Sequence, residues 1–131
     1  MGKEVLTINV RIKEALEVKG STNGATMILF DGDCDCDNFK GKILPGGVDT
    51  QRIGEDGLVS LSARYIMEGV DRNGQVCRIF IENNGKILPD GSMTTEPYVL
   101  TDSAALKFLE DASLTGTVEG APEGVVIHIF D

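Results

Sequence analysis

The amino-acid sequence predicts an all-β fold, a small antiparallel β-barrel of about eight to ten strands with one short helix near residues 102–110. Glycine is frequent, with 16 in 131 residues, and it divides the chain into short segments. Most of these segments alternate apolar and polar residues, which is the period of a half-buried strand. A barrel is favoured over a sandwich because closure removes exposed strand edges and the chain is too short for two large sheets.

The expected strands follow one another along the whole chain and are separated by glycine, proline or asparagine. They cover residues 5–12, 25–31, 39–44, 58–68, 76–83, 97–101, 113–119 and 124–130, and another begins near Asp49. The clearest is 58–68, whose apolar face includes Ala63 and Tyr65. Between this strand and the next, Asn73 and Gly74 are suited to a type I′ hairpin turn.

One segment has the pattern of a helix. In residues 102–111, Asp102 or Ser103 is expected to cap the first turn, and apolar residues such as Leu106 follow at helical spacing. No linker or low-complexity segment divides the chain, so residues 1–131 are expected to form a single β-barrel domain.

A short repeat interrupts the alternation, since GKILPGG at 41–47 recurs as GKILPDG at 85–91. The simpler interpretation is two strands that each stop at a turn containing proline and glycine. A duplicated half-barrel is the alternative, although the flanking sequences do not match.

The charge balance limits the partners. The chain has 21 acidic and 12 basic residues, a net charge of −9, so phosphate backbones and anionic lipid would repel it. We therefore expect no nucleic-acid and no membrane partner, but a small-molecule ligand and self-association as a homo-oligomer. The first residues lack the pattern of a secretion signal. Three cysteines in such a chain fit a reducing compartment, and a cytoplasmic location is expected.

The stretch FDGDCDCDNFKG at 30–41 raises the question of a metal site. The aspartates of 31–37 have the spacing of a calcium loop, but Cys36 and Lys42 replace the glycine and glutamate that an EF-hand needs. On a strand the aspartates would face solvent and the cysteines the core. Divalent-cation binding by the acidic row, and a zinc or redox role for Cys34 with Cys36, are the alternatives. No metal site and no cofactor are predicted.

Polar side chains on apolar strand faces are the main candidates for a site. Asp49 follows the Pro-Gly-Gly segment, and Tyr65 and Asn83 each lie in line with apolar residues of their strands. A buried polar group without a partner costs about 1–3 kcal/mol. These three groups either satisfy one another or point into a cavity that holds a ligand. In the second case a desolvated Asp49 would have a raised pKa and could move a proton, while Tyr65 and Asn83 stabilise an enolate or oxyanion.

The same residues lie in segments that resemble a known family. The segments FKGKILPGGVDTQ, GLVSLSARYIME, IFIENNG, PYVLTDSAALKFLEDASLTGTV and GVVIHIF are similar to the domain-of-unknown-function family 3237. The resemblance implies a lipocalin-like barrel with no assigned activity. It matches Gly46, Gly47 and Asp49 to the first family motif, Tyr65 to the second, in which arginine or another residue precedes the tyrosine, and Asn83 with Gly85 to the third. The chain departs from the family at GDCDCDNFKG and at NGKILPDG.

We therefore expect a barrel that binds a small organic molecule in its interior, with a lyase or isomerase reaction as the catalytic interpretation. Asp49 and Tyr65 would be catalytic, and the ligand-binding residues would be Asn83, Gly46, Gly47 and Arg64. The first alternative is a non-catalytic binding module on the same barrel. The second is a structural protein with a filled core that acts through self-association.

Overall fold

The computed structural model describes residues 2–131 and confirms the predicted fold class, with nine antiparallel strands and one short helix. The strands are β1 (Glu4–Lys19), β2 (Gly24–Asp35), β3 (Phe39–Ile43), β4 (Val48–Ile53), β5 (Val59–Asp71), β6 (Val76–Ile87), β7 (Met93–Thr101), β8 (Thr115–Ala121) and β9 (Gly124–Phe130). The helix α1 (Phe108–Asp111) lies between β7 and β8 and has four residues. No helix in this described part is long and apolar enough to cross a membrane.

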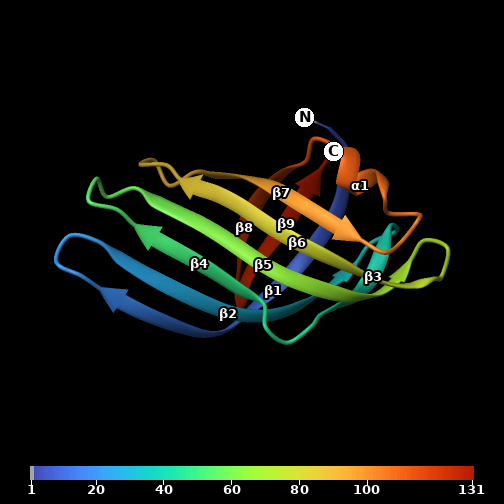
Figure 1. The fold of residues 1–131 in the computed structure, drawn as a ribbon, viewed down its shortest axis with the longest axis horizontal. Coiled ribbons are helices and arrows are strands. Elements are labelled where there is room, and N and C mark those ends of the chain that lie inside the picture. The colour runs from blue at the N-terminus through green and yellow to red at the C-terminus, as the bar shows by residue number, and fades with distance from the viewer. Residues whose placement is uncertain (1) are drawn as a thin grey trace.

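The sheet closes on itself because β1 pairs with β9 on one side and with β2 on the other. From β5 to β9 each strand pairs with the next along the chain. The short strands β3 and β4 lie one after the other between β2 and β5, and each of them pairs with both of these strands. They therefore share one place in the barrel, and the nine strands occupy eight positions. In Figure 1, β8 and β9 lie behind β5 and β6, across the barrel from them.

The first copy of the repeat ends β3 at a turn that contains Pro45 and Gly46, as the sequence interpretation expected, but the chain does not reverse there. Ile43 faces Met67 and Val48 faces Arg64, so the four residues 44–47 lie opposite only two residues of β5. The chain bulges at this point and continues as β4 in the same direction. Gly46 has a φ of +111°, a conformation that is strained for any residue with a side chain, and this allows the bulge.

The second copy, in contrast, leads into a true hairpin between β6 and β7. The N–H of Leu88 donates to the carbonyl of Ser92, and Gly91 has a φ of +86°. The turn between β5 and β6 also has a left-handed glycine, Gly74, with a φ of +78°. Asn73 does not have a positive φ, so the turn is not the predicted type I′. The N–H of Gly74 donates to the carbonyl of Asp71 at 2.9 Å, so the turn closes at this left-handed glycine instead.

The helix is shorter than predicted. It begins at Phe108 rather than near Asp102, because the residues before it form separate turns. The carboxylate of Asp102 accepts the backbone N–H of Arg78 at 2.8 Å, and Ser103 Oγ accepts that of Leu106 at 3.2 Å. The side chains of the two predicted caps therefore stabilise the first of these turns and connect it to β6, before the helix begins.

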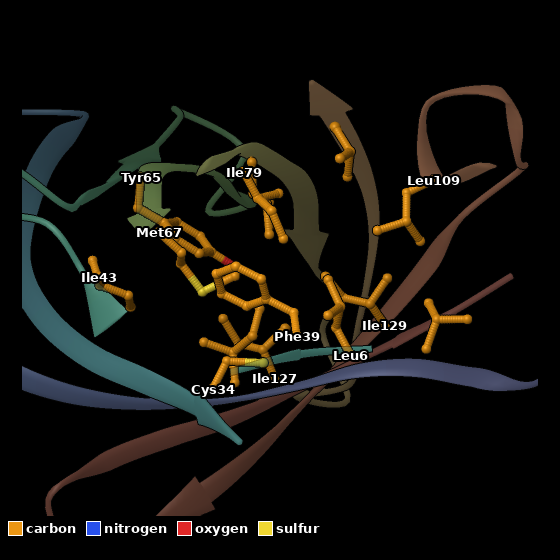
Figure 2. Packing of buried hydrophobic residues seen from close by; sticks show 14 of the residues in the cluster. Leu6, Cys34, Phe39, Ile43, Tyr65, Met67, Ile79, Leu109, Ile127 and Ile129 are labelled. Carbon is orange, nitrogen blue, oxygen red and sulfur yellow. The ribbon is translucent and has the colours of Figure 1, made fainter. Parts of the chain in front are cut away.

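The apolar core lies toward one end of the barrel, beside α1 and the two chain termini (Figure 1). Its largest fully buried side chains are Leu6, Ile8, Phe39, Met67, Ile79, Ile81, Val99, Leu106, Leu109 and Ile129. Figure 2 shows Phe39 inside this cluster, with Leu6, Met67 and Ile129 near it. Burial of these side chains is the main favourable term in folding. We call this region the closed end.

The other end of the barrel is open. The hairpins β1–β2, β4–β5 and β6–β7 extend there beyond β8 and β9, as Figure 1 shows. Inward positions are only partly covered, since Ile12 is 49% exposed and Ile53 is 44% exposed. Asp49 and Gln51, on the inward face of β4, are half-buried. We call this region the open end, and the candidate site lies where the two ends meet.

Candidate functional site

The inward face of three neighbouring strands brings the predicted polar residues together. Asp49 on β4 faces Ala63 on β5, and Ala63 faces Asn83 on β6. These residues therefore form one row across the sheet. Tyr65 lies two residues further along β5 and on the same face of the sheet. The predicted catalytic and amide groups thus share one wall of the barrel interior.

Thr95 on β7 belongs to the same wall, and the sequence reasoning missed it. It is fully buried and faces Gly85 on β6 and Gly116 on β8. A Cβ at Gly116 would lie 2.3 Å from Thr95 Oγ1 and 3.7 Å from Asn83 Oδ1, so a glycine here lets Thr95 Oγ1 pack against the backbone of β8 close to Asn83. The expected strand began at Pro97, although Thr95 continues its alternation, and this was the signal that could have found it.

Each of the four side chains on this wall has a buried oxygen without a hydrogen-bond partner among the described residues. The atoms are Asp49 Oδ1, Tyr65 Oη, Asn83 Oδ1 and Thr95 Oγ1. We call these four residues the polar layer. A buried polar atom that stays unpaired costs about 1–3 kcal/mol, and in native proteins such atoms are rare. Four of them on one interior wall make this wall the candidate site.

Asp71, a buried carboxylate at the closed end, shows the usual arrangement. Its Oδ1 accepts the backbone N–H groups of Asn73 and Gln75, and its Oδ2 accepts the hydroxyl of Ser103 at 2.7 Å. These hydrogen bonds, the one from Ser103 first, lower the pKa of Asp71 below its usual value. This network is complete and structural, in contrast to the polar layer.

The environment of Asp49 favours its protonated form. Burial raises the pKa of Asp49 above its usual value, and the hydrogen bond from Gln51 Nε2 to Asp49 Oδ2, 2.9 Å long, offsets part of that rise. A protonated carboxyl can donate as well as accept a hydrogen bond. A carboxyl whose pKa is raised toward neutral pH is also better suited to take up and return a proton.

Tyr65 is directed into the closed end. Figure 2 shows its ring reaching toward Met67 and Phe39, with the hydroxyl inside the apolar cluster. The ring also contacts Phe30 edge to face, with centroids 5.4 Å apart and an interplanar angle of 73°. Burial raises the pKa of Tyr65 well above its usual value, so the hydroxyl is a neutral donor rather than a base. Asp49 and Tyr65 share a wall, but no hydrogen bond joins them in the described chain.

The remaining predicted ligand-binding residues lie elsewhere. Gly46 is exposed at the tip of the bulge, and a Cβ there would meet nothing within 4 Å. Gly47 is buried, and a Cβ there would lie 3.0 Å from the Phe30 carbonyl oxygen, so its role is close backbone packing. Arg64 points outward and pairs with Glu82, Nε to Oε2 at 2.6 Å. The structure therefore does not bring these residues to the polar layer.

The side chain of Arg64 lines a groove of about 800 Å³ on the outer face of β4 to β7. The groove lining also includes Thr50, Arg52, Ser62, Lys86 and Glu96, which alternate with the interior residues of the same strands. Ser62 Oγ in this groove is buried and has no partner among the described residues. The groove is a second candidate binding surface, with a basic lining, and none of the polar-layer residues lines it.

The acidic row lies on the outer surface of β2. Asp31 and Asp33 accept hydrogen bonds from Arg11 at 3.2 and 3.0 Å, while Cys34 faces the core. This is the strand arrangement that the sequence indicated, with the acids outside and the thiols inside. Within residues 2–131, no three His, Cys, Asp or Glu side chains gather closely enough to hold a metal ion.

His128, the one histidine in the chain, also faces outward. Its Nδ1 lies 2.7 Å from Glu4 Oε2, and its Nε2 lies 3.1 Å from Glu119 Oε1. The hydrogen bond to Glu4, followed by the one to Glu119, raises the pKa of His128. The imidazole is held at the surface and takes no part in the interior wall.

The fold and this wall define a class of protein, a closed antiparallel barrel with polar groups in its interior. The chain belongs to the family described as protein of unknown function (DUF3237), whose family model matches residues 3–94. This confirms the resemblance found in the sequence. A UPF0311 protein from Clostridium acetobutylicum is 43% identical over 63 residues, which are 47% of this chain. The match covers 37% of that relative, so it spans little more than a third of its length.

Solved structures share the fold over nearly the whole chain. A protein with unknown function from Clostridium acetobutylicum ATCC 824 superposes with a TM-score of 0.82 at 26% identity, covering 98% of this chain and 96% of that one. A beta-barrel-like protein from Acinetobacter baumannii superposes with a TM-score of 0.75 at 14% identity, covering 99% of this chain and 94% of that one. The second likeness shows the fold alone.

Proposed function

We propose that the protein binds a small, neutral, oxygen-rich organic molecule in the barrel interior, at the polar layer. The observation that carries this proposal is the set of four buried oxygens without partners on one wall. A ligand with hydroxyl or carbonyl groups would pair with them and remove the cost of about 1–3 kcal/mol that each unpaired group carries. A purely structural network would instead join the four groups to one another, and those oxygens make no such bonds in the described chain.

The charge distribution favours a neutral ligand over an anion. The polar layer holds one carboxyl, Asp49, while the basic side chains Arg52, Arg64 and Lys86 of the same strands lie on the outer face. An anion buried beside a carboxylate without a neighbouring cation would carry a large desolvation cost. The apolar neighbours of the layer, among them Phe30, suit the hydrocarbon body of the ligand.

Asp49 is the residue through which binding would become catalysis. A carboxylate of raised pKa can take a proton from a carbon beside a carbonyl and return it elsewhere, which is a step of lyases and isomerases. The hydroxyls of Thr95 and Tyr65 are neutral donors for the oxygen on which negative charge develops. A protein described as an enzyme, from Penicillium herquei, has this fold with a TM-score of 0.73 at 17% identity, covering 97% of this chain and 92% of that one.

The proposal is tested by thermal shift with two sets of small probes, neutral polyols and phenols against carboxylates of the same size. Neutral probes are expected to raise the melting temperature, and Thr95→Val and Asp49→Asn are expected to abolish the effect. The matched control is Thr50→Val, because Thr50 is next to Asp49 on β4 but faces outward. A response to carboxylates alone, or one lost in Thr50→Val and kept in Thr95→Val, would contradict interior binding.

The catalytic step has its own experiment. An enolisable cyclic ketone is incubated with the protein in D₂O, and loss of the proton signal beside the carbonyl is followed by NMR. Exchange that disappears in Asp49→Asn supports proton transfer by Asp49. Binding of neutral probes without any exchange supports the non-catalytic binding module instead. Self-association and a cytoplasmic location stay predictions, independent of both experiments.

A further inference from the structure

The two thiols of the DCDCD stretch lie close together at the hairpin end of β2. Cys34 Sγ and Cys36 Sγ are 3.3 Å apart, on the same face of the chain. Cys34 is fully buried, and Figure 2 shows its side chain inside the apolar cluster. Cys36 is half-buried and lies one residue beyond the end of β2. The pair therefore consists of one thiol that small solutes can reach and one that the core shields.

The accessible thiol lies against the backbone of β1, where Cys36 Sγ can donate to the Thr7 carbonyl at 3.4 Å when protonated and accepts the Thr7 N–H as a thiolate. The N–H of Thr7 donates to Cys36 Sγ at 3.1 Å, and the Cys34 thiol lies within hydrogen-bond distance on the other side. These hydrogen bonds, the one from Cys34 first, lower the pKa of Cys36 below that of an ordinary cysteine. The hydrogen bond to Cys36 and then burial raise the pKa of Cys34. Two roles are thus set apart, with a nucleophile at Cys36 and a protonated neighbour at Cys34.

The backbone geometry permits a bond between the two sulfurs. Residues two apart on a strand have Cα atoms about 6.4–6.8 Å apart, which is the upper limit of the range found in disulfides. Cys36 is outside the regular strand, and the turn that follows starts with its N–H donating to the carbonyl of Phe39 at 2.9 Å. Its backbone is therefore less constrained than that of Cys34, and a modest shift would bring Sγ within bonding distance.

We propose that Cys36 and Cys34 form a reversible redox dithiol that reacts with a small hydroperoxide. In the first step the Cys36 thiolate attacks one peroxide oxygen, the O–O bond breaks, and Cys36 becomes a sulfenic acid while water or an alcohol leaves after protonation. In the second step the Cys34 sulfur attacks Cys36 Sγ and releases water, which forms the Cys34–Cys36 disulfide. Overall, two thiols and one hydroperoxide give one disulfide, one water and one water or alcohol.

The surroundings favour an uncharged oxidant. Asp33, Asp35 and Asp37 alternate with the thiols on the outer side of the chain, and the side chain of Asp35 is 82% exposed. Arg11 pairs with Asp31 and Asp33, Lys13 with Asp31, and Lys40 with Asp35, so only Asp37 of the acidic row has no ion pair among the described residues. The repulsion comes instead from the net charge of −9 on the chain, which would slow anionic disulfides such as oxidised glutathione but not hydrogen peroxide or small alkyl hydroperoxides.

The disulfide would change the packing of the hairpin. The Sγ of Cys36 would move toward Cys34 and away from the N–H of Thr7, so that a link between β1 and the end of β2 is lost. The neighbouring Asn38, whose Nδ2 donates to the Val5 carbonyl at 2.9 Å, holds the same corner. Disulfides at the limit of the allowed geometry are more easily reduced. The structure therefore supports a disulfide that forms and is reduced again rather than a permanent crosslink.

The test compares the folded wild-type protein with Cys34→Ser, Cys36→Ser and Cys77→Ser under limiting hydrogen peroxide. Cys77 is buried on β6 and serves as the matched control. Intact mass should show the loss of two hydrogens in wild type and in Cys77→Ser, reversed by dithiothreitol. Cys34→Ser should instead accumulate a Cys36 sulfenic acid that dimedone traps. Cys36→Ser should react at least about tenfold more slowly than wild type.

Other results would overturn the proposal. One is a Cys34→Ser variant that still loses two hydrogens, which would assign the bond to Cys77. Others are covalent dimers in place of the internal disulfide, or oxidation only after the protein is unfolded in urea. A second measurement needs no oxidant: iodoacetamide should label Cys36 first, with a midpoint below the pH of about 8.5 that is usual for a free thiol. Labelling of Cys36 with an ordinary or higher midpoint would remove the nucleophile that the proposal requires.

Discussion

The two ends of the barrel interior are built from the same strands but from different side chains. At the closed end, apolar residues such as Phe39 and Ile79 are fully buried, and the buried Asp71 has all its hydrogen bonds. In the polar layer four buried oxygens have no partner in the described chain, three of them where the closed end meets the open end and one, of Tyr65, reaching into the closed end. If the polar layer binds the ligand as proposed, the difference teaches that stability and binding are separated along the barrel axis. Substitutions at the two ends should therefore behave in opposite ways.

The largest effect is expected from truncation at the closed end. Ile79→Ala should lower the free energy of unfolding by about 2–5 kcal/mol, because it removes a fully buried side chain and leaves a cavity. The matched control on the same strand is Val76→Ala, since Val76 is 77% exposed and its truncation should change stability by less than about 0.5 kcal/mol. Urea unfolding checks both. Similar effects for the two variants would contradict the assignment of the core.

The next largest effect on stability is expected where Gly116 packs against Thr95. Gly116→Ala should destabilise the protein by about 1–3 kcal/mol, because its Cβ would come within 2.3 Å of Thr95 Oγ1. It should also abolish binding of neutral probes at the polar layer. Gly120→Ala on the same strand is the control, since a Cβ there meets nothing within 4 Å. Equal melting temperatures for the two variants would show that Gly116 does not border the polar layer.

The sharpest contrast between the two ends comes from removing an unpaired hydroxyl. Thr95→Val and Tyr65→Phe should leave the ligand-free protein as stable as wild type or up to about 1–3 kcal/mol more stable, since each removes a buried group without a partner. Ser103→Ala at the closed end should lower stability by about 1–3 kcal/mol, because it leaves the buried Oδ2 of Asp71 without its partner. Urea unfolding of the three variants measures this, and a loss in all three would make the polar layer a structural network.

The smallest effect is a pH dependence linked to Asp49. Its folded-state pKa lies above its usual 3.8, so the stability it contributes is complete below that pH and is lost as pH rises through the folded-state pKa. Asn cannot ionise, so Asp49→Asn should be more stable than wild type at pH 7, and the difference should shrink as the pH falls through the folded-state pKa and level off below 3.8. Unfolding at several pH values tests this. Asp37→Asn, at an exposed position, should stay within about 0.5 kcal/mol of wild type throughout.

The sequence predicted the strands well because period-two alternation is a local property of the chain. It also placed Tyr65 and Asn83 on the inward face, since alternation alone decides the face of a strand. What alternation does not decide is how strands follow one another. The two copies of the GKILP segment are nearly identical, yet one forms a bulge within a barrel position and the other leads into a hairpin. The pairing partners β2 and β5, which are distant in sequence, determine that outcome.

The composition of the polar layer was only partly predictable for the same reason. Thr95 joins it through Gly85 and Gly116, two glycines on neighbouring strands whose register no single segment reveals. Arg64 was assigned to the ligand through its neighbour Tyr65, but adjacent residues on a strand point to opposite faces. The outer groove that contains Arg64 could not be anticipated, because its shape depends on the twist and curvature of four paired strands.

The most direct test of the central claim is methyl-resolved NMR of the wild-type protein titrated with the neutral polyol and phenol probes. Interior methyl groups of Ala63 and Thr95 report on the polar layer, and those of Val48 and Thr50 report on the outer groove. The account predicts shifts at the interior methyls, with those of the groove and of Leu109 at the closed end unchanged. Shifts confined to Val48 and Thr50, or none at any probe concentration, would contradict a binding site inside the barrel.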